Sequence, residues 1–127
     1  MSSNRVITEV LDRIRSEEFR GPTRVTQAAL RALDEASRVS RSGSPNEFAK
    51  EQATFADLLV KTRPTAILLA NGVRLVIDSV RRGADQGLVV SALRDIVSKT
   101  VDSFLGEIQK SVDQIGDIGA RRLRSGD

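Results

Sequence analysis

The sequence predicts an all-α fold, a bundle of about five helices of which the last is long. Apolar residues recur at intervals of three and four along most of the 127 residues, as in amphipathic helices. No run of alternating apolar and polar residues is long enough to indicate a strand. One apolar stripe continues over residues 88–115, roughly 30 residues, which as a helix is about 45 Å long. The length and the 39% hydrophobic content favour a single helical domain, residues 1–127.

The first two helices are expected on either side of a glycine–proline break. Asn4 can cap a helix over residues 4–16, and the pair Gly21 and Pro22 then interrupts the pattern. A second helix follows over residues 23–41, and its alanines predict a close approach to a neighbouring helix. The inner positions expected in these two helices are Val6, Ile7, Val10, Leu11, Ile14, Val25, Ala28, Ala29, Ala32, Leu33, Ala36 and Val39.

The third helix has a clear start signal. Ser44 can accept a hydrogen bond from the third amide while Glu47 reaches back, and Pro45 suits the first helical position. The pattern predicts that this helix ends near Lys61. Its expected inward residues are Phe48, Phe55, Leu58 and Leu59.

The fourth and fifth helices complete the predicted bundle. Thr62 is expected to cap a fourth helix that carries Pro64 in its first turn and stops near Gly83. Asp85 is expected to cap the last helix, which must span the whole bundle or reach a partner. After Ile115 three glycines predict a helix end and a connection. The expected inward residues are Ile67, Leu68, Val73, Val76, Ile77 and Val80 in the fourth helix and Leu88, Val89, Ala92, Leu93, Ile96, Val97, Val101, Phe104, Leu105, Ile108, Val112 and Ile115 in the last.

The composition excludes several kinds of chemistry. The chain has no cysteine, histidine, tryptophan or tyrosine, so disulfides, thiolate nucleophiles, Cys/His zinc sites and a Ser-His-Asp triad are excluded. No carboxylates are paired for acid–base work. The sequence therefore predicts no catalytic residue, no metal-binding residue and no cofactor. The longest uncharged apolar run, residues 64–73, is too short to span a bilayer, and the N-terminus does not resemble a signal peptide, so a cytoplasmic protein without a membrane partner is expected.

Charge gives little support for nucleic-acid binding. The net charge is only +3, and the basic clusters at residues 81–82 and 121–124 are interpreted as surface or helix-end charges. Four phenylalanines offer little material for base stacking. A small helical nucleic-acid-binding protein is kept as an alternative, because the glycine–proline turn before Thr23 invites comparison with a helix-turn-helix.

Two loop-to-helix junctions are candidates for an anion site. Residues 20–23 and 62–65 each combine an arginine and hydroxyl groups with the start of a predicted helix. A helix N-terminus offers unpaired amides and a positive dipole end, and arginine can hold a phosphate with two parallel hydrogen bonds. The alternative is that both arginines are ordinary surface charges beside turns. Asn71, a polar residue in an apolar run, is either a packing amide or reaches a neighbouring loop.

The same segments resemble a known family. Residues 62–74 read TRPTAILLANGVR, which resembles a segment of sugar-phosphate aldose–ketose isomerases. This group includes methylthioribose-1-phosphate isomerase, archaeal ribose-1,5-bisphosphate isomerase and the regulatory subunits of translation initiation factor 2B. Residues 20–25 (RGPTRV) and 115–123 (IGDIGARRL) are similar to two further family segments, in the family's order. The archaeal branch fits best, because Asn71 and Arg74 suit its version of the helix.

The resemblance covers the family's N-terminal helical domain only. It implies a Rossmann-like C-terminal domain with a catalytic cysteine and aspartate, and that domain is absent from the 127 residues. The expected partners are this domain, in trans or missing from the chain, a second copy in a homo-oligomer, and a sugar phosphate or nucleotide ligand.

The resemblance also assigns phosphate-binding residues. It implies that Arg20, Gly21 and Arg63 contact the substrate phosphate. Pro22 stands where the family usually has alanine, and because proline lacks an amide hydrogen the phosphate site would lose one donor. Further support for the ligand is expected from Thr62, Thr65 and Asn71.

Three functions remain open at this point. The first is a helical interaction or regulatory domain of an initiation factor 2B-like or ribose-bisphosphate isomerase-like protein, which contributes phosphate contacts and an assembly surface. The second is the N-terminal fragment of an active sugar-phosphate isomerase, and the third is the nucleic-acid binder. Under the first two, the chain by itself is not expected to be an enzyme.

Overall fold

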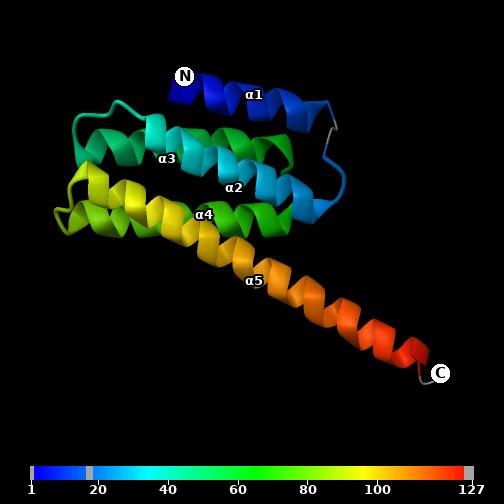
Figure 1. Ribbon diagram of the computed structural model, residues 1–127. Helices are drawn as coiled ribbons and strands as arrows, with labels where there is room; N and C mark the ends of the chain where they lie inside the picture. The colour runs from blue at the N-terminus through cyan, green and yellow to red at the C-terminus, as the bar shows by residue number, and fades with distance from the viewer. Residues whose placement is uncertain (1, 17–18, 125–127) are drawn as a thin grey trace.

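Five helices make up the protein in the computed structural model, which describes residues 2–16 and 19–124, with side chains as far as residue 111. The described residues contain no strand, so the predicted all-α class is confirmed, as is the long last helix. The helices are α1 (Ser3–Arg15), α2 (Pro22–Val39), α3 (Pro45–Thr62), α4 (Ile67–Asp85) and α5 (Val90–Arg124) (Figure 1).

Consecutive helices run in opposite directions and are joined by short loops (Figure 1). The α1–α2 and α3–α4 loops therefore lie at one end of the bundle, and the α2–α3 and α4–α5 loops lie at the other. Helix α2 is central, because it packs against each of the other four helices. Helix α1 packs on α2 and α3, whereas α5 packs on α4 and α2 and runs toward the end that holds the α1–α2 loop.

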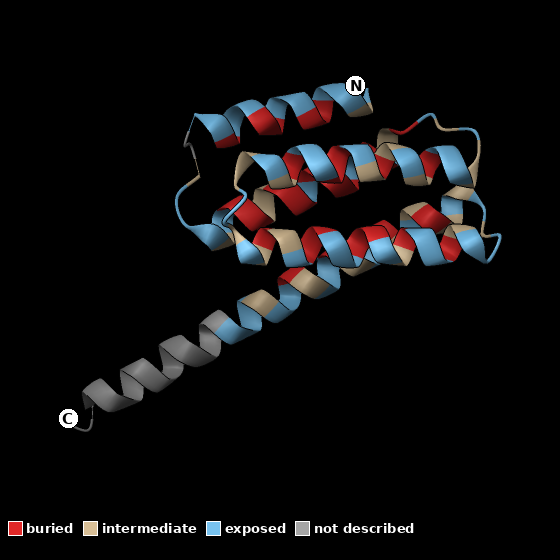
Figure 2. Ribbon diagram, turned by 180° about the vertical axis from the view of Figure 1, so that it is seen from behind, coloured by how far each residue is buried: buried red, intermediate tan, exposed pale blue. Residues whose placement is uncertain are grey.

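The core draws apolar residues from all five helices (Figure 2). Ala29 and Ala36 are fully buried in α2, which confirms the predicted close approach along its alanines. The sequence pattern did not reveal that polar residues of α2 are buried as well. They are Thr26, Asp34 and Ser37.

The first two helices begin earlier than predicted. The N-cap of α1 is Ser2, not Asn4, and the Ser2 hydroxyl accepts a hydrogen bond from the Arg5 amide at 3.2 Å. Helix α2 begins directly at Pro22 because Gly21 adopts φ 86°, a left-handed conformation that favours glycine. It ends at Val39 instead of near residue 41.

The predicted start of α3 is confirmed. The Ser44 hydroxyl accepts a hydrogen bond from the Glu47 amide at 3.2 Å, while the Glu47 carboxylate accepts one from the Gly43 amide at 3.3 Å. Leu58 was expected to point inward and is instead 38% exposed. It lies one residue, about 100° of helical turn, from the buried Leu59, and therefore falls outside the inner face.

The predicted cap of α4 is wrong. Thr62 is the last residue of α3, and its hydroxyl donates a hydrogen bond to the Leu59 carbonyl at 2.6 Å. The Ala66 amide donates to the Arg63 carbonyl, which closes a turn over residues 63–66, so α4 begins only at Ile67. Ile67 was expected to be buried, but at this outer position it is 75% exposed.

The connection from α4 to α5 also differs from the prediction. Asp85 ends α4 and does not cap α5. The Leu88 and Gly87 amides donate to the Gly83 and Ala84 carbonyls, each at 3.0 Å, while Gly87 adopts φ 81°. This pattern is a Schellman motif, in which the left-handed glycine lies after the helix end. Gly83, predicted as the stop, is buried inside α4.

Helix α5 is longer than expected. Its 35 residues span about 52 Å, whereas the 18 or 19 residues of α2, α3 and α4 span under about 30 Å. It begins at Val90, so Leu88 and Val89 precede it, and Val89 is 63% exposed. The predicted end after Ile115 is wrong, because the helix continues to Arg124. The predicted inward side chains of Val112 and Ile115 lie outside the described residues.

No helix in the described part of the chain combines the length and hydropathy that crossing a bilayer requires.

Candidate functional site

The two arginine-bearing junctions lie at the same end of the bundle. One is the α1–α2 loop and the other is the α3–α4 loop (Figure 1). A cavity of about 240 Å³ lies between them and includes Gly21 and Arg63 in its lining. The structure thus brings together two of the three residues that the sequence assigned to a phosphate. Its full lining is Phe19, Gly21, Pro22, Val25, Arg63 and Ala66.

Two helix N-termini flank this cavity. Gly21 and Ala66 are the N-caps of α2 and α4, and neither helix has a hydrogen bond from an N-cap side chain. The first amides of a helix have no partner within it, and the macrodipole makes this end positive. Pro22, the first residue of α2, contributes no amide hydrogen, so the donors of α2 begin at Thr23. The positive ends of two helices beside one cavity favour an anion over a cation.

Arg63 is half-buried. It precedes α4, but its side chain is hydrogen-bonded to α1. One of its terminal nitrogens donates to the Ile14 carbonyl at 3.2 Å, in the last turn of α1. The positive guanidinium therefore lies against the negative end of the α1 macrodipole, which offsets the unfavourable position before α4. A guanidinium has five N–H donors, and this bond uses one of them.

The other predicted site residues do not line the cavity. Arg20 is exposed beside Gly21 and is not part of the cavity lining. Thr62 uses its hydroxyl within α3, and Thr65 is exposed in the turn. Asn71 is exposed on α4, so the interpretation as a packing amide is wrong. Neither these two threonines nor Asn71 lines the cavity.

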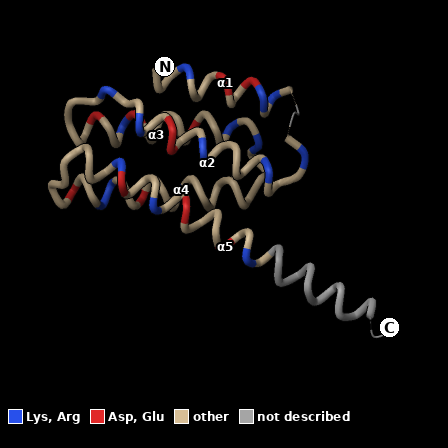
Figure 3. Tube along the Cα trace, in the orientation of Figure 1, with Lys and Arg blue, Asp and Glu red and all other residues tan. Residues whose placement is uncertain are grey.

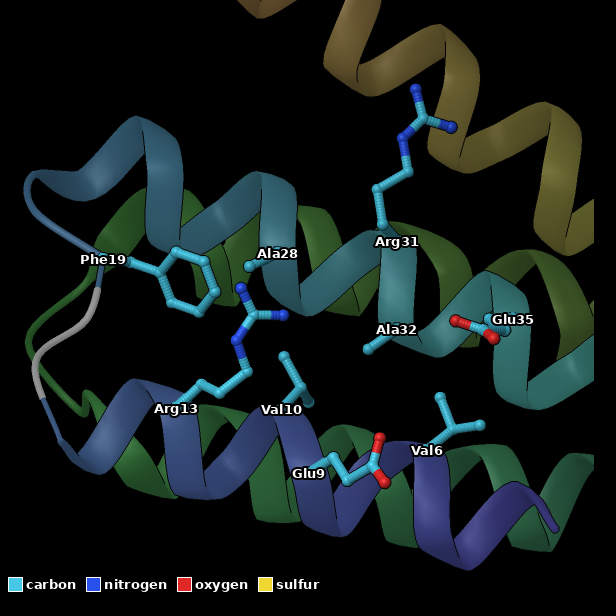
Figure 4. A pocket seen from close by; sticks show the side chains of 9 residues that line it. All are labelled: Val6, Glu9, Val10, Arg13, Phe19, Ala28, Arg31, Ala32 and Glu35. Carbon is cyan, nitrogen blue, oxygen red and sulfur yellow. The ribbon is translucent and has the colours of Figure 1, made fainter. Parts of the chain in front are cut away.

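Phe19 is a site residue that the sequence reasoning missed. It lines the cavity, and the guanidinium carbon of Arg13 lies 4.7 Å from the centroid of its ring. Phe19 also lines a second cavity of about 320 Å³ between α1 and α2 (Figure 4). The signal in the sequence was an aromatic residue directly before the Arg20–Gly21 pair.

The lining limits what the cavity can do chemically. It contains one cation, one aromatic ring and aliphatic groups, and no carboxylate or hydroxyl side chain. In the part of the chain that the structure describes, no cluster of three or more acidic, histidine or cysteine residues could hold a metal ion. The geometry therefore favours binding an anion over moving a proton.

Charge is spread evenly over the described helices. Basic and acidic residues are interspersed along the described parts of the helices (Figure 3). Several cations are paired with carboxylates, among them Arg31 with Asp102 at 2.6 Å and Lys61 with Asp57 at 2.8 Å. The inner face of α2, the expected recognition helix of a helix-turn-helix, is buried. These observations weigh against the nucleic-acid alternative.

Comparison with known proteins identifies relatives. A profile described as the initiation factor 2 subunit family matches residues 18–127. The chain is 30% identical over 121 residues to ribose 1,5-bisphosphate isomerase of Thermococcus kodakarensis, and 30% identical over 127 residues to that of Methanocaldococcus jannaschii. These matches cover 95% and 100% of the chain but only 38% and 39% of the relatives' lengths. A putative methylthioribose-1-phosphate isomerase of Archaeoglobus fulgidus is 24% identical over 97% of the chain and 35% of its own length.

Proposed function

Because the chain belongs to the initiation factor 2 subunit family, we propose that it is the helical, phosphate-binding part of a ribose-bisphosphate isomerase-like or initiation factor 2B-like protein. In this role it contributes phosphate contacts and an assembly surface and does not catalyse by itself. The observation that carries the proposal is the cavity where Gly21, Arg63 and the N-termini of α2 and α4 meet.

Each group at the cavity has a distinct role in this proposal. Arg63, held by the Ile14 carbonyl, presents its planar fork to the phosphate oxygens. Gly21 lets the backbone approach the ligand closely because it has no side chain. Arg20, exposed beside the cavity, reaches the anion from the solvent side. The positive helix ends add an attraction that does not depend on side-chain rotamers.

Catalysis would require groups from outside the chain. The cavity lining offers no proton-transferring side chain, and the chain spans about 38% of the length of the curated relatives it matches. Helix α5 runs past the cavity end of the bundle and projects away from it, so polypeptide that follows it would begin beyond the bundle (Figure 1). A Rossmann-like domain that packs back against the cavity end would supply the reacting groups.

Calorimetric titration with ribose 1,5-bisphosphate and with AMP tests the phosphate role, using the chain alone and together with a Rossmann-like domain from the same family. We expect Arg63→Ala to weaken binding at least about tenfold, because a charge-assisted pair is worth about 1.5–3 kcal/mol. Arg20→Ala should weaken it less, since Arg20 does not line the cavity. Arg41→Ala removes the same charge in the loop at the opposite end of the bundle and should leave affinity unchanged. Equal affinities for all four proteins would reject the anion role.

A second candidate, the N-terminal part of an active sugar-phosphate isomerase, is favoured by the names of the relatives. It predicts that a reading frame continuing past Asp127 encodes a Rossmann-like domain with a cysteine and an aspartate. Isomerase activity of the joined protein on ribose 1,5-bisphosphate would support this candidate, and a stop codon without such a domain elsewhere in the gene cluster would contradict it.

A further inference from the structure

The last turn of α1 contacts two walls of the anion cavity without lining the cavity itself. The Ile14 carbonyl accepts a hydrogen bond from Arg63, and the Arg13 guanidinium lies over the ring of Phe19. Arg63 and Phe19 both line the cavity, whereas no residue of α1 does. Two independent contacts from one helical turn therefore converge on one site.

These contacts start from a firmly packed helix. Helix α1 buries five side chains against the bundle, and Ile14 itself is only 1% exposed. The carbonyl that holds Arg63 is consequently fixed in place. A free arginine side chain loses up to about 2 kcal/mol of rotamer entropy when it is immobilised, and a guanidinium that is already held loses less on binding.

Phe19 belongs to the lining of two spaces. One is the anion cavity, and the other is the groove between α1 and α2, whose lining also includes Glu9 and Val10 (Figure 4). Figure 4 shows the Arg13 side chain reaching from α1 across this groove to the ring. A cation over an aromatic face restrains the ring, so Arg13 helps to set the position of one cavity wall.

We propose that the last turn of α1 is the positioning element of the anion site, acting through Arg13 on Phe19 and through the Ile14 carbonyl on Arg63. This inference rests on the proposed phosphate-binding function. Because coupling between two equilibria is reciprocal, a bound phosphate also stabilises the last turn of α1. Helix α1 thereby becomes sensitive to the ligand although it does not touch it.

The test measures affinity for inorganic phosphate by calorimetry in the intact chain. We expect Arg13→Gln to weaken binding about two- to fivefold, the equivalent of an exposed cation–π contact. Arg13→Lys should restore most of the loss because it keeps a cation over the ring. Arg15→Gln is the matched control: it removes the same charge from the same turn, and Arg15 is exposed with Asp12 as its ion-pair partner at 3.9 Å.

A double-mutant cycle separates positioning from simple charge loss. If Arg13 acts through the ring, Arg13→Gln has no further effect on phosphate affinity in a Phe19→Leu background. Hydrogen exchange gives a second readout, since phosphate should slow exchange of the amides in the last turn of α1.

The outcomes are distinguishable. If the unmodified chain binds phosphate and Arg63→Ala abolishes binding, while Arg13→Gln and Arg15→Gln behave alike and exchange in α1 is unchanged, the inference is overturned and the proposed function stands. If neither inorganic phosphate nor ribose 1,5-bisphosphate binds the unmodified chain, alone or together with the Rossmann-like domain, the proposed function fails and the inference fails with it.

Discussion

At the scale of single residues, Gln52 stands out among the buried polar groups. It is fully buried in α3, and neither its amide oxygen nor its amide nitrogen has a partner among the described residues. Burying an amide without a hydrogen-bond partner costs about 1–3 kcal/mol. The helical pattern of apolar residues gave no sign of this, because a glutamine is ordinarily placed on the exposed face.

Replacing Gln52 by methionine should therefore stabilise the fold. Methionine has a similar length and fills the same space without an amide, so we expect Gln52→Met to raise the free energy of unfolding by about 1 kcal/mol. Urea denaturation followed by circular dichroism measures the change. Gln86→Met, at an exposed position after α4, is the control and should have no effect. A loss of stability in Gln52→Met would mean that the amide has a partner.

At the scale of helices, arginines from elsewhere in the chain satisfy the carbonyls at helix ends. Arg63 bonds the end of α1, and Arg94 of α5 donates to the Ser37 and Ser40 carbonyls at the end of α2, at 3.1 and 2.6 Å. The last carbonyls of a helix have no amide partner inside that helix. These side-chain hydrogen bonds therefore supply donors that the helix itself lacks. They also fix how α1 and α5 lie against the rest of the bundle.

The contact of α4 with α5 and α2 depends on Gly72. A Cβ atom added there would lie 2.7 Å from a ring carbon of Phe104 and 2.9 Å from a methyl carbon of Leu30. Leu30 is fully buried, so its methyl group can shift only by displacing other core side chains. We expect Gly72→Ala to lower the free energy of unfolding by about 1–2 kcal/mol, even though alanine favours the helix by about 1 kcal/mol.

Gly106 provides the matched comparison for Gly72. It is an exposed position of α5 where an added Cβ would meet nothing within 4 Å. Only helix propensity then acts, and Gly106→Ala should raise the free energy of unfolding by about 0.5–1 kcal/mol. Thermal or urea denaturation of both variants gives the answer. Changes of the same sign would show that close packing at Gly72 does not decide the outcome.

At the scale of the whole molecule, the charge distribution predicts weak binding to nucleic acid. Basic and acidic groups are interspersed over the described helices (Figure 3). Few phosphates can then be neutralised together, so we expect the logarithm of the affinity for duplex DNA to fall with the logarithm of salt with a slope shallower than about −3. Fluorescence anisotropy between about 0.05 and 0.2 M salt measures this slope. A slope near −6 or steeper would restore the nucleic-acid alternative.

Local patterns predicted some features well and others poorly. The cap at Ser44 was predictable because the serine, the proline and Glu47 lie within four residues. Thr62 and Asp85 have the same cap-like character but end helices instead of starting them. Their roles depend on the turns that follow, at residues 63–66 and at the left-handed Gly87, and the periodicity of apolar residues does not reveal these turns.

The sequence by itself determined the all-α class, the five helices and the pair of arginine-bearing junctions, because periodicity and composition are properties of neighbouring residues. Only the tertiary structure decided that Gly21 and Arg63 share a cavity, that Arg63 bonds a carbonyl 49 residues away and that Phe19 forms a wall under Arg13. These features arise where helices distant in the chain pack together, and no local pattern encodes which side chains then meet.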